Sequence, residues 1–245
     1  MTEITLERSD HVALVTLRAP QRRNAFTVPM VQELLAACDE IDGDLSIGAT
    51  VFQAEGESFC AGAHRALLEE AGRDPATPEN YEALGMAYRG FVRVGELQAP
   101  TIAAVRGHAV GAGVNLMLAT DLRIVASNMQ VITGFSRIGI HPGGGHFVLL
   151  NRLAGREAAA GLSVFGIPID GRRAVELGLA WEALPEAEVE PRALDIARQI
   201  AHDPALARAT ARSFRLELGP PSVSWPAALE VERGPQMWSL RRRAQ

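Results

Sequence analysis

The chain has few cysteines, no basic excess and no long apolar run, and each absence excludes a class of protein. Only Cys38 and Cys60 occur among 245 residues, so no disulfide framework is predicted and the reducing cytoplasm is the expected location. The formal net charge of -5 argues against a nucleic-acid partner. The arginines at 241–243 form a short basic end, which we interpret as a solvated tail.

The sequence also shows no features of a membrane span or a signal peptide. No apolar run approaches the ~18 residues of a membrane span, and residues 1–10 lack the basic and apolar regions of a signal peptide. We therefore expect a soluble, unprocessed protein without a membrane partner. With 47% hydrophobic residues, the chain can bury a sizeable core.

One stretch organises the chain: a buried strand, a glycine-spaced loop and the start of a buried helix. The strand is expected at residues 102–105 and the helix at 114–119, with Gly107, Gly111 and Gly113 between them. Backbone N–H groups at a helix start lack intrahelical partners, so the loop can hold a phosphate or a developing oxyanion.

A loop of this kind can form a dinucleotide site, an oxyanion pocket or a close packing contact. A dinucleotide fingerprint requires glycine or alanine where Leu116 stands, and an acidic residue about 20 positions on, whereas Asp121 comes much sooner. The chain contains neither a G-x-S-x-G elbow nor a phosphate-loop signature. An oxyanion pocket and glycines that serve only close packing both remain open.

Elsewhere strands and helices alternate, which predicts an α/β fold with a parallel sheet and right-handed crossovers. We expect a core domain over residues 1–190 and a helical C-terminal region over 191–245. Two antiparallel strands should meet at Ser9-Asp10, and Thr27 should cap a helix that Gly43 ends. Further strands are expected at 49–53, 122–126, 129–132 and 179–184, helices at 65–70, 81–97, 147–153, 172–177 and 191–200, and a turn-rich connection at 73–80.

Five motifs, in this order, resemble the crotonase, or enoyl-CoA hydratase/isomerase, family. They are Arg23-Asn24-Ala25-Phe26, Phe59-Cys60-Ala61-Gly62-Ala63, Gly107 to Gly113 with Asp121-Leu122-Arg123, Gly139 to Gly145, and Gly178-Leu179-Ala180. The resemblance implies a crotonase/ClpP-like core of repeated ββα turns around two near-perpendicular sheets, with an α-helical C-terminal region. It further implies a homotrimer or dimer of trimers that binds acyl-CoA thioesters. Coenzyme A would arrive as part of the substrate, without a separate cofactor or metal.

The family's common step is stabilisation of a thioester enolate by two backbone N–H groups. By resemblance these belong to Ala63 and Ala112, and such donors supply several kcal/mol when they are aimed at an oxygen that gains charge. The same resemblance places coenzyme A against Ala25, Ala61, Ala63 and Gly111, with Arg22 or Arg23 on its phosphates unless both arginines only face solvent.

The sequence departs from the family at its acids. Hydratases carry glutamates at the positions of Asn115 and Phe135, isomerases carry one at Phe135, and some relatives carry an aspartate at Gly143. The carboxylate pair that general acid–base hydration requires is therefore absent. Asn115 could bind a substrate oxygen, while His141 and His146 could supply a base or merely orient loops.

The leading hypothesis is an acyl-CoA-binding protein of the enoyl-CoA hydratase/isomerase kind with an oxyanion hole but without the two usual glutamates. The alternatives are a catalytically silent acyl-CoA binding or shuttle protein, and a hydrolase or carbon–carbon lyase that uses a histidine. Apolar residues expected between subunits are Leu216, Leu218, Val223, Trp225, Leu229, Val231, Met237 and Trp238.

Overall fold

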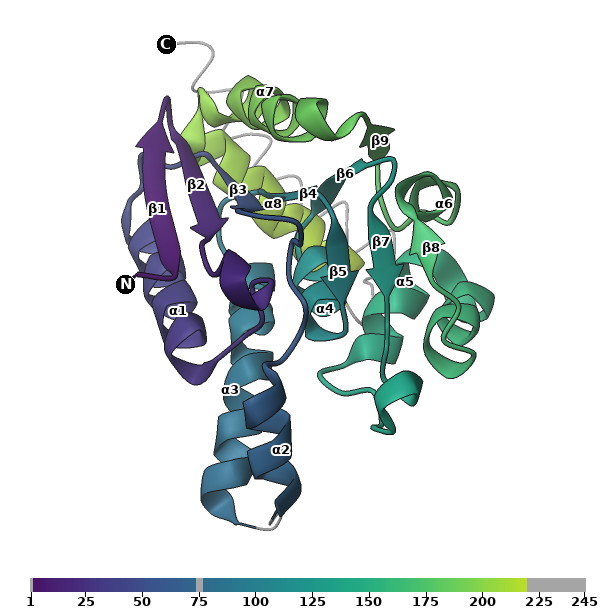
Figure 1. Cartoon of the computed structure of the whole chain (residues 1–245). Helices are drawn as coiled ribbons and strands as arrows, with labels where there is room; N and C mark the ends of the chain where they lie inside the picture. The colour runs from purple at the N-terminus through teal and green to yellow at the C-terminus, as the bar shows by residue number, and fades with distance from the viewer. Residues whose placement is uncertain (1, 74–76, 220–245) are drawn as a thin grey trace, which may run out of the picture.

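A six-stranded sheet forms the centre of the computed structural model, which describes residues 2–73 and 77–219 (Figure 1). The first two strands pair antiparallel, as predicted for the break at Ser9-Asp10, and all later neighbours pair parallel. In sheet order the strands are β1 (Ile4–Ser9), β2 (Val12–Leu17), β3 (Ala49–Ala54), β4 (Thr101–Val105), β6 (Leu122–Ala126) and β9 (Glu182–Leu184).

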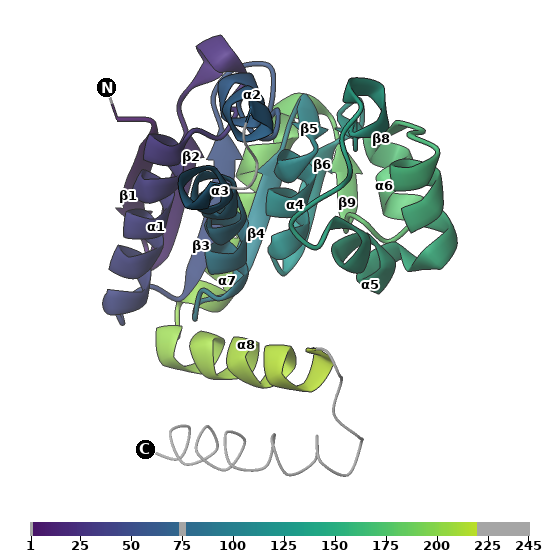
Figure 2. The same cartoon turned by 90° about the horizontal axis from the view of Figure 1, so that it is seen from below.

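Helices cover both faces of this sheet, which explains why every residue of β4 is buried. Figures 1 and 2 show α1, α3 and α4 on one face and α7 on the other, where α7 contacts β3, β4 and β6. The α-helices are α1 (Val28–Gly43), α2 (Arg65–Arg73), α3 (Pro78–Gly95), α4 (Ala112–Ala119), α5 (His146–Ala159), α6 (Gly171–Glu176), α7 (Val189–Ala201) and α8 (Pro204–Leu218). Short 3-10 helices are η1 (Pro20–Arg22), η2 (Ser136–Ile138) and η4 (Glu186–Glu188), and η3 (Ala160–Val164) is a short π-helix.

A second sheet of three strands stands beside α5 and α6 (Figure 1). It consists of β5 (His108–Val110), β7 (Gln130–Ile132) and β8 (Ile169–Asp170). The sequence analysis treated residues 107–113 as a loop and missed β5. Three residues between two glycines are too few to show an alternating pattern, and β5 becomes a strand through its pairing with β7 and its bridge to Cys60.

Side-chain caps form at the starts of α1 and α6, and the first of them confirms the prediction for Thr27. The Thr27 hydroxyl accepts a hydrogen bond from the Met30 N–H at the start of α1, and Asp170 caps α6 through the Arg173 N–H. The turn-rich connection predicted at 73–80 was too long. Arg73 ends α2 and Pro78 already begins α3, because Thr77 caps that helix through the Asn80 N–H.

The predicted α/β class and the helical C-terminal region are confirmed, with α7 and α8 following the last strand. The domain boundary at residue 190 stays a prediction. The basic end at 241–243 and the subunit-contact residues from Val223 to Trp238 lie outside the described residues. Within them, Leu216 and Leu218 are exposed.

Candidate active site

Two loops from different parts of the chain meet backbone to backbone at the edge of the sheets. Gly62 has φ +89°, and a Cβ there would lie 2.8 Å from the Val110 oxygen and 3.3 Å from the Ala112 nitrogen. A Cβ on Gly113 would lie 2.1 Å from the Cys60 oxygen. Only glycine allows both approaches, so these two residues bring the 61–63 and 110–113 segments together.

Each of these loops leaves one amide N–H unpaired. Phe26 forms a parallel bridge with Ala63, in which the Phe26 N–H donates to the Gly62 oxygen and the His64 N–H donates to the Phe26 oxygen. Ala112 is the first residue of α4, where an N–H has no partner within the helix. Over residues 2–73 and 77–219, neither the Ala63 nor the Ala112 N–H donates a hydrogen bond.

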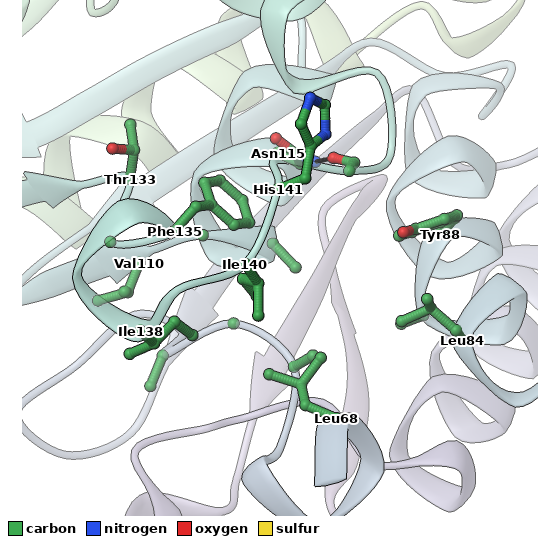
Figure 3. Close-up of a pocket in the computed structure, with 18 of the residues that line it drawn as sticks. Leu68, Leu84, Tyr88, Val110, Asn115, Thr133, Phe135, Ile138, Ile140 and His141 are labelled. Atoms are coloured by element: carbon green, nitrogen blue, oxygen red, sulfur yellow. Dashed lines mark hydrogen bonds between the residues drawn. The ribbon is translucent and has the colours of Figure 1, made fainter. Parts of the chain in front are cut away.

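Both alanines line a cavity of about 490 Å³. Figure 3 shows Leu84 and Tyr88 of α3 on one side and Phe135 with Ile138 on the other. No aspartate or glutamate occurs among the described residues that line it. The lining residues are Ala61, Gly62, Ala63, Leu68, Asn80, Leu84, Ala87, Tyr88, Val110, Gly111, Ala112, Asn115, Thr133, Gly134, Phe135, Ile138, Ile140, His141 and Gly143.

Asn115 and Phe135, the positions that by resemblance correspond to the hydratase glutamates, both line this cavity. The Phe135 ring lies 3.7 Å from the place a Gly111 Cβ would occupy and meets the His146 ring edge-on, with 4.9 Å between centroids. Asn115 is buried, and its amide nitrogen donates to the Gly143 oxygen at 3.1 Å and to the Gly144 oxygen at 3.4 Å. Polar atoms of Asn115 are thus occupied within the protein.

His146 is the histidine that the fold buries, with 1% of its surface exposed. Its Nδ1 lies 2.6 Å from the Asn115 Oδ1, and its Nε2 is buried without a partner among the described residues. Burial lowers the pKa of His146 from 6.5 to about 4, because an imidazolium there would lose its hydration. The side chain is therefore neutral at physiological pH.

His141, the predicted catalytic histidine, lines the cavity from an exposed loop. Figure 3 places it beside Asn115 at one end of the cavity. Its Nδ1 lies 2.6 Å from the Pro142 oxygen, a contact that assigns the proton to Nδ1 and leaves Nε2 as an acceptor.

The residues predicted to bind coenzyme A differ in which of their polar groups already have partners within the protein. The Ala61 N–H donates to the Arg23 oxygen at 2.9 Å, and Ala25 is buried in the same segment. Arg22 makes a two-pronged ion pair with Glu3 and lowers the pKa of that carboxyl, mainly through its hydrogen bonds. Arg23 is exposed, and its side chain has no partner among the described residues.

Sequence reasoning missed most of the cavity wall. Leu84 and Tyr88 follow an amphipathic pattern that predicts burial in a core, whereas they also border the cavity from α3. Leu68 of α2 and Ile140 give no sequence signal for a site, since apolar residues do not reveal which side of a helix or loop faces a cavity.

No group of three or more histidine, cysteine, aspartate or glutamate residues in the described part of the chain could hold a metal ion. Both cysteines are buried, which raises the pKa of each thiol to about 12 and keeps it unreactive at neutral pH. A helix long and apolar enough to span a membrane was likewise not found in residues 2–73 and 77–219.

The two sheets, the close backbone approach at Gly62 and the apolar cavity beside it belong to a crotonase fold, as superposition on solved enoyl-CoA hydratases shows. Residues 7–222 match the enoyl-CoA hydratase/isomerase family, and the chain belongs to that family. The recognition made from five motifs is thereby confirmed.

Named relatives agree with this assignment. The chain is 37% identical to "Probable enoyl-CoA hydratase EchA14" of Mycobacterium tuberculosis, over 97% of this chain and 92% of the relative. It is 32% identical to 1,2-epoxyphenylacetyl-CoA isomerase of Escherichia coli, over 79% and 74% of the two chains. A crystal structure of an enoyl-CoA hydratase from Polaromonas sp. JS666 superposes with a TM-score of 0.87 at 26% identity, covering 97% of this chain and 91% of that one.

Proposed function

We propose that this protein binds acyl-CoA thioesters and stabilises the thioester enolate with the N–H groups of Ala63 and Ala112. The observation that carries the proposal is that both N–H groups lack a partner among the described residues and border one apolar cavity. Unpaired donors at fixed positions bind an oxygen most strongly when it gains charge, because they need no reorganisation during the reaction. The protein would then be enoyl-CoA hydratase/isomerase-like, without the two usual glutamates.

The cavity favours a hydrocarbon acyl group. The Thr133 hydroxyl donates to the Leu162 oxygen, and the amide nitrogen of Asn115 is held by two loop carbonyls. The wall presented by Leu68, Val110, Phe135 and neighbouring side chains is apolar. A hydroxyl on the acyl chain would lose its hydration there, so an unsubstituted chain should bind better.

Coenzyme A would lie along Ala25, Ala61 and Gly111, with a phosphate near Arg23. Arg22 is the weaker candidate, because its guanidinium is already paired with Glu3. The chain contains no lysine, so an arginine has to supply any cationic phosphate contact. No cofactor beyond the coenzyme portion of the substrate belongs to this proposal.

His141 is the proposed proton acceptor. Its Nε2 would remove a proton from the carbon next to the thioester carbonyl, the C–H electron pair would form the enolate, and the same proton would return in the reverse step. A silent binding or shuttle function is the second candidate, favoured by the absence of carboxylates from the described cavity lining. A histidine-dependent hydrolase or carbon–carbon lyase remains the third hypothesis.

A homotrimer or dimer of trimers in the cytoplasm completes the proposal. Large apolar side chains are exposed on the part of the molecule that carries α5, η3 and β9, and a monomer would leave them in water. They include Phe147, Val148, Leu153, Val164, Phe165, Ile167 and Trp181.

Acetoacetyl-CoA tests the central claim, since its enolate absorbs in the near ultraviolet and its keto form does not. A pH titration of the complex should give an enolisation pKa well below that of free acetoacetyl-CoA. An unchanged pKa would refute the oxyanion hole. Incubation of butyryl-CoA in D₂O, followed by mass spectrometry, then separates an enzyme, which introduces deuterium, from a silent binder, which does not.

A further inference from the structure

A polar contact links the first residue of α5 to the middle of α4 beneath the cavity. His146 and Asn115 are both 1% exposed, and the His146 Nδ1 lies 2.6 Å from the Asn115 Oδ1. The amide nitrogen of Asn115 faces the oxygens of Gly143 and Gly144. A carbonyl accepts only from a donor, so these contacts assign the amide orientation and require that the His146 Nδ1 carry a proton.

These contacts hold the turn at Gly143 and Gly144, which packs closely against α3. Gly144 and Gly145 have φ values of +68° and +74°, and a Cβ on Gly144 would lie 2.4 Å from the Phe91 ring. A Cβ on Gly143 would lie 2.4 Å from the Tyr88 oxygen. The turn therefore packs closely against α3. Gly143 in the turn and its neighbours Ile140 and His141 form part of the cavity wall.

His146 does more than fill space in the core. Its buried Nε2 has no hydrogen-bond partner among the described residues, and a buried acceptor without a donor destabilises the fold. An apolar side chain such as phenylalanine would fill this place without that penalty, but it would leave the Asn115 oxygen unpaired. The Nδ1–H is thus the feature of His146 that the site uses.

We propose that His146 is a positioning residue of the acyl site. Its Nδ1–H fixes the amide of Asn115, the amide holds the 143–144 turn, and the turn sets the cavity wall around Ile140 and His141. This inference rests on the proposed function in one respect, namely that the cavity receives the acyl group. His146 itself takes no part in proton transfer.

Four variants separate positioning from packing. His146→Phe removes the donor, whereas His146→Asn keeps an N–H near the position of Nδ1. Asn115→Asp removes the N–H groups that hold the turn and so tests the other end of the same contact. Leu150→Ala is the matched control, because Leu150 is buried on the same helix, one turn further on, and outside the network.

Two measurements are made on the full chain. Calorimetry gives the ratio of the affinities for butyryl-CoA and for free coenzyme A, and amide hydrogen exchange without ligand reports on residues 139–145. We expect His146→Phe and Asn115→Asp to lower the affinity ratio about tenfold and to speed exchange in this segment. His146→Asn should restore most of the ratio, and Leu150→Ala should lower thermal stability while it leaves the ratio unchanged.

The proposal is overturned if His146→Phe and Asn115→Asp keep the wild-type ratio and exchange rates, or if Leu150→Ala lowers the ratio equally. Should His146→Phe fail to fold, Asn115→Asp gives the decisive comparison. Wild-type protein that binds butyryl-CoA no more tightly than coenzyme A would instead refute the proposed function. Exchange in residues 139–145 still tests the contact in that case, so the two failures are distinguishable.

Discussion

Replacing Ala112 by proline removes one proposed oxyanion donor with little damage to the fold. Ala112 is the first residue of α4, a position that tolerates proline because its N–H lacks a helical partner. The preceding Gly111 has φ +51° and ψ -113°, outside the helical region that proline disfavours before it. Ala112→Ser is the matched control, since serine keeps the N–H.

The size of the effect follows from the value of one donor. An oxyanion-hole hydrogen bond contributes about 3 kcal/mol to the charged state. At 1.36 kcal/mol per pKa unit, its loss should raise the enolisation pKa of bound acetoacetyl-CoA by about 2 units. The proline ring also occupies the place of the lost hydrogen, so the thioester oxygen cannot move closer to a substitute.

The assay is the spectrophotometric pH titration of the complex, together with calorimetry of free coenzyme A. Ala112→Pro should raise the enolisation pKa while it keeps most of the coenzyme A affinity, and Ala112→Ser should match the wild type. A proline variant with normal circular dichroism, normal coenzyme A affinity and an unshifted enolisation pKa would show that the Ala112 N–H is not used.

The remaining predictions concern crotonyl-CoA hydration, the pH dependence of stability, coenzyme A binding and assembly. Wild-type protein should hydrate crotonyl-CoA at least about 10²-fold more slowly than a two-glutamate hydratase, because positioned acids and bases each contribute 10²–10⁴-fold. Hydration by the wild type at ordinary family rates would contradict this expectation. Asn115→Glu combined with Phe135→Glu should restore only part of the hydratase rate, since the first change also breaks the contacts to the 143–144 turn. The pKa of His146 falls from 6.5 in the unfolded chain to about 4 in the fold. The free energy of unfolding that depends on a neutral His146 is therefore fully present above pH 6.5 and is lost as the pH falls towards 4. Urea unfolding should show wild type losing about 3 kcal/mol more than His146→Phe over that range, and parallel pH profiles would argue against it. Arg23→Ala should weaken coenzyme A binding about tenfold, whereas Arg22→Ala should mainly lower stability, by about 1 kcal/mol; calorimetry and thermal unfolding distinguish the two, and the reverse order would contradict the assignment. Light scattering should show a trimer or hexamer at micromolar concentration, and a stable monomer would disprove that assembly.

The local sequence was sufficient for the elements that depend on short-range chemistry. Thr27 and Asp170 cap their helices because a side-chain oxygen three residues before a free N–H acts within one turn. The strand predicted at 102–105 is a continuous apolar run, which is typical of a strand covered on both faces, and in the fold it begins one residue earlier at Thr101. The ordered glycine motifs identified the family, because close backbone approaches such as those at Gly62 and Gly113 admit no other residue.

The cavity, by contrast, was decided by contacts between residues far apart in the chain. Arg22 and Arg23 are indistinguishable as sequence, yet only the fold brings Glu3 to Arg22 and leaves Arg23 exposed. Asn115 suggested a group for the substrate, but His146, 31 residues later, reaches its oxygen. Local periodicity reports which residues are buried and not which polar atoms remain unpaired, because hydrogen-bond partners are chosen only when the helices and sheets pack.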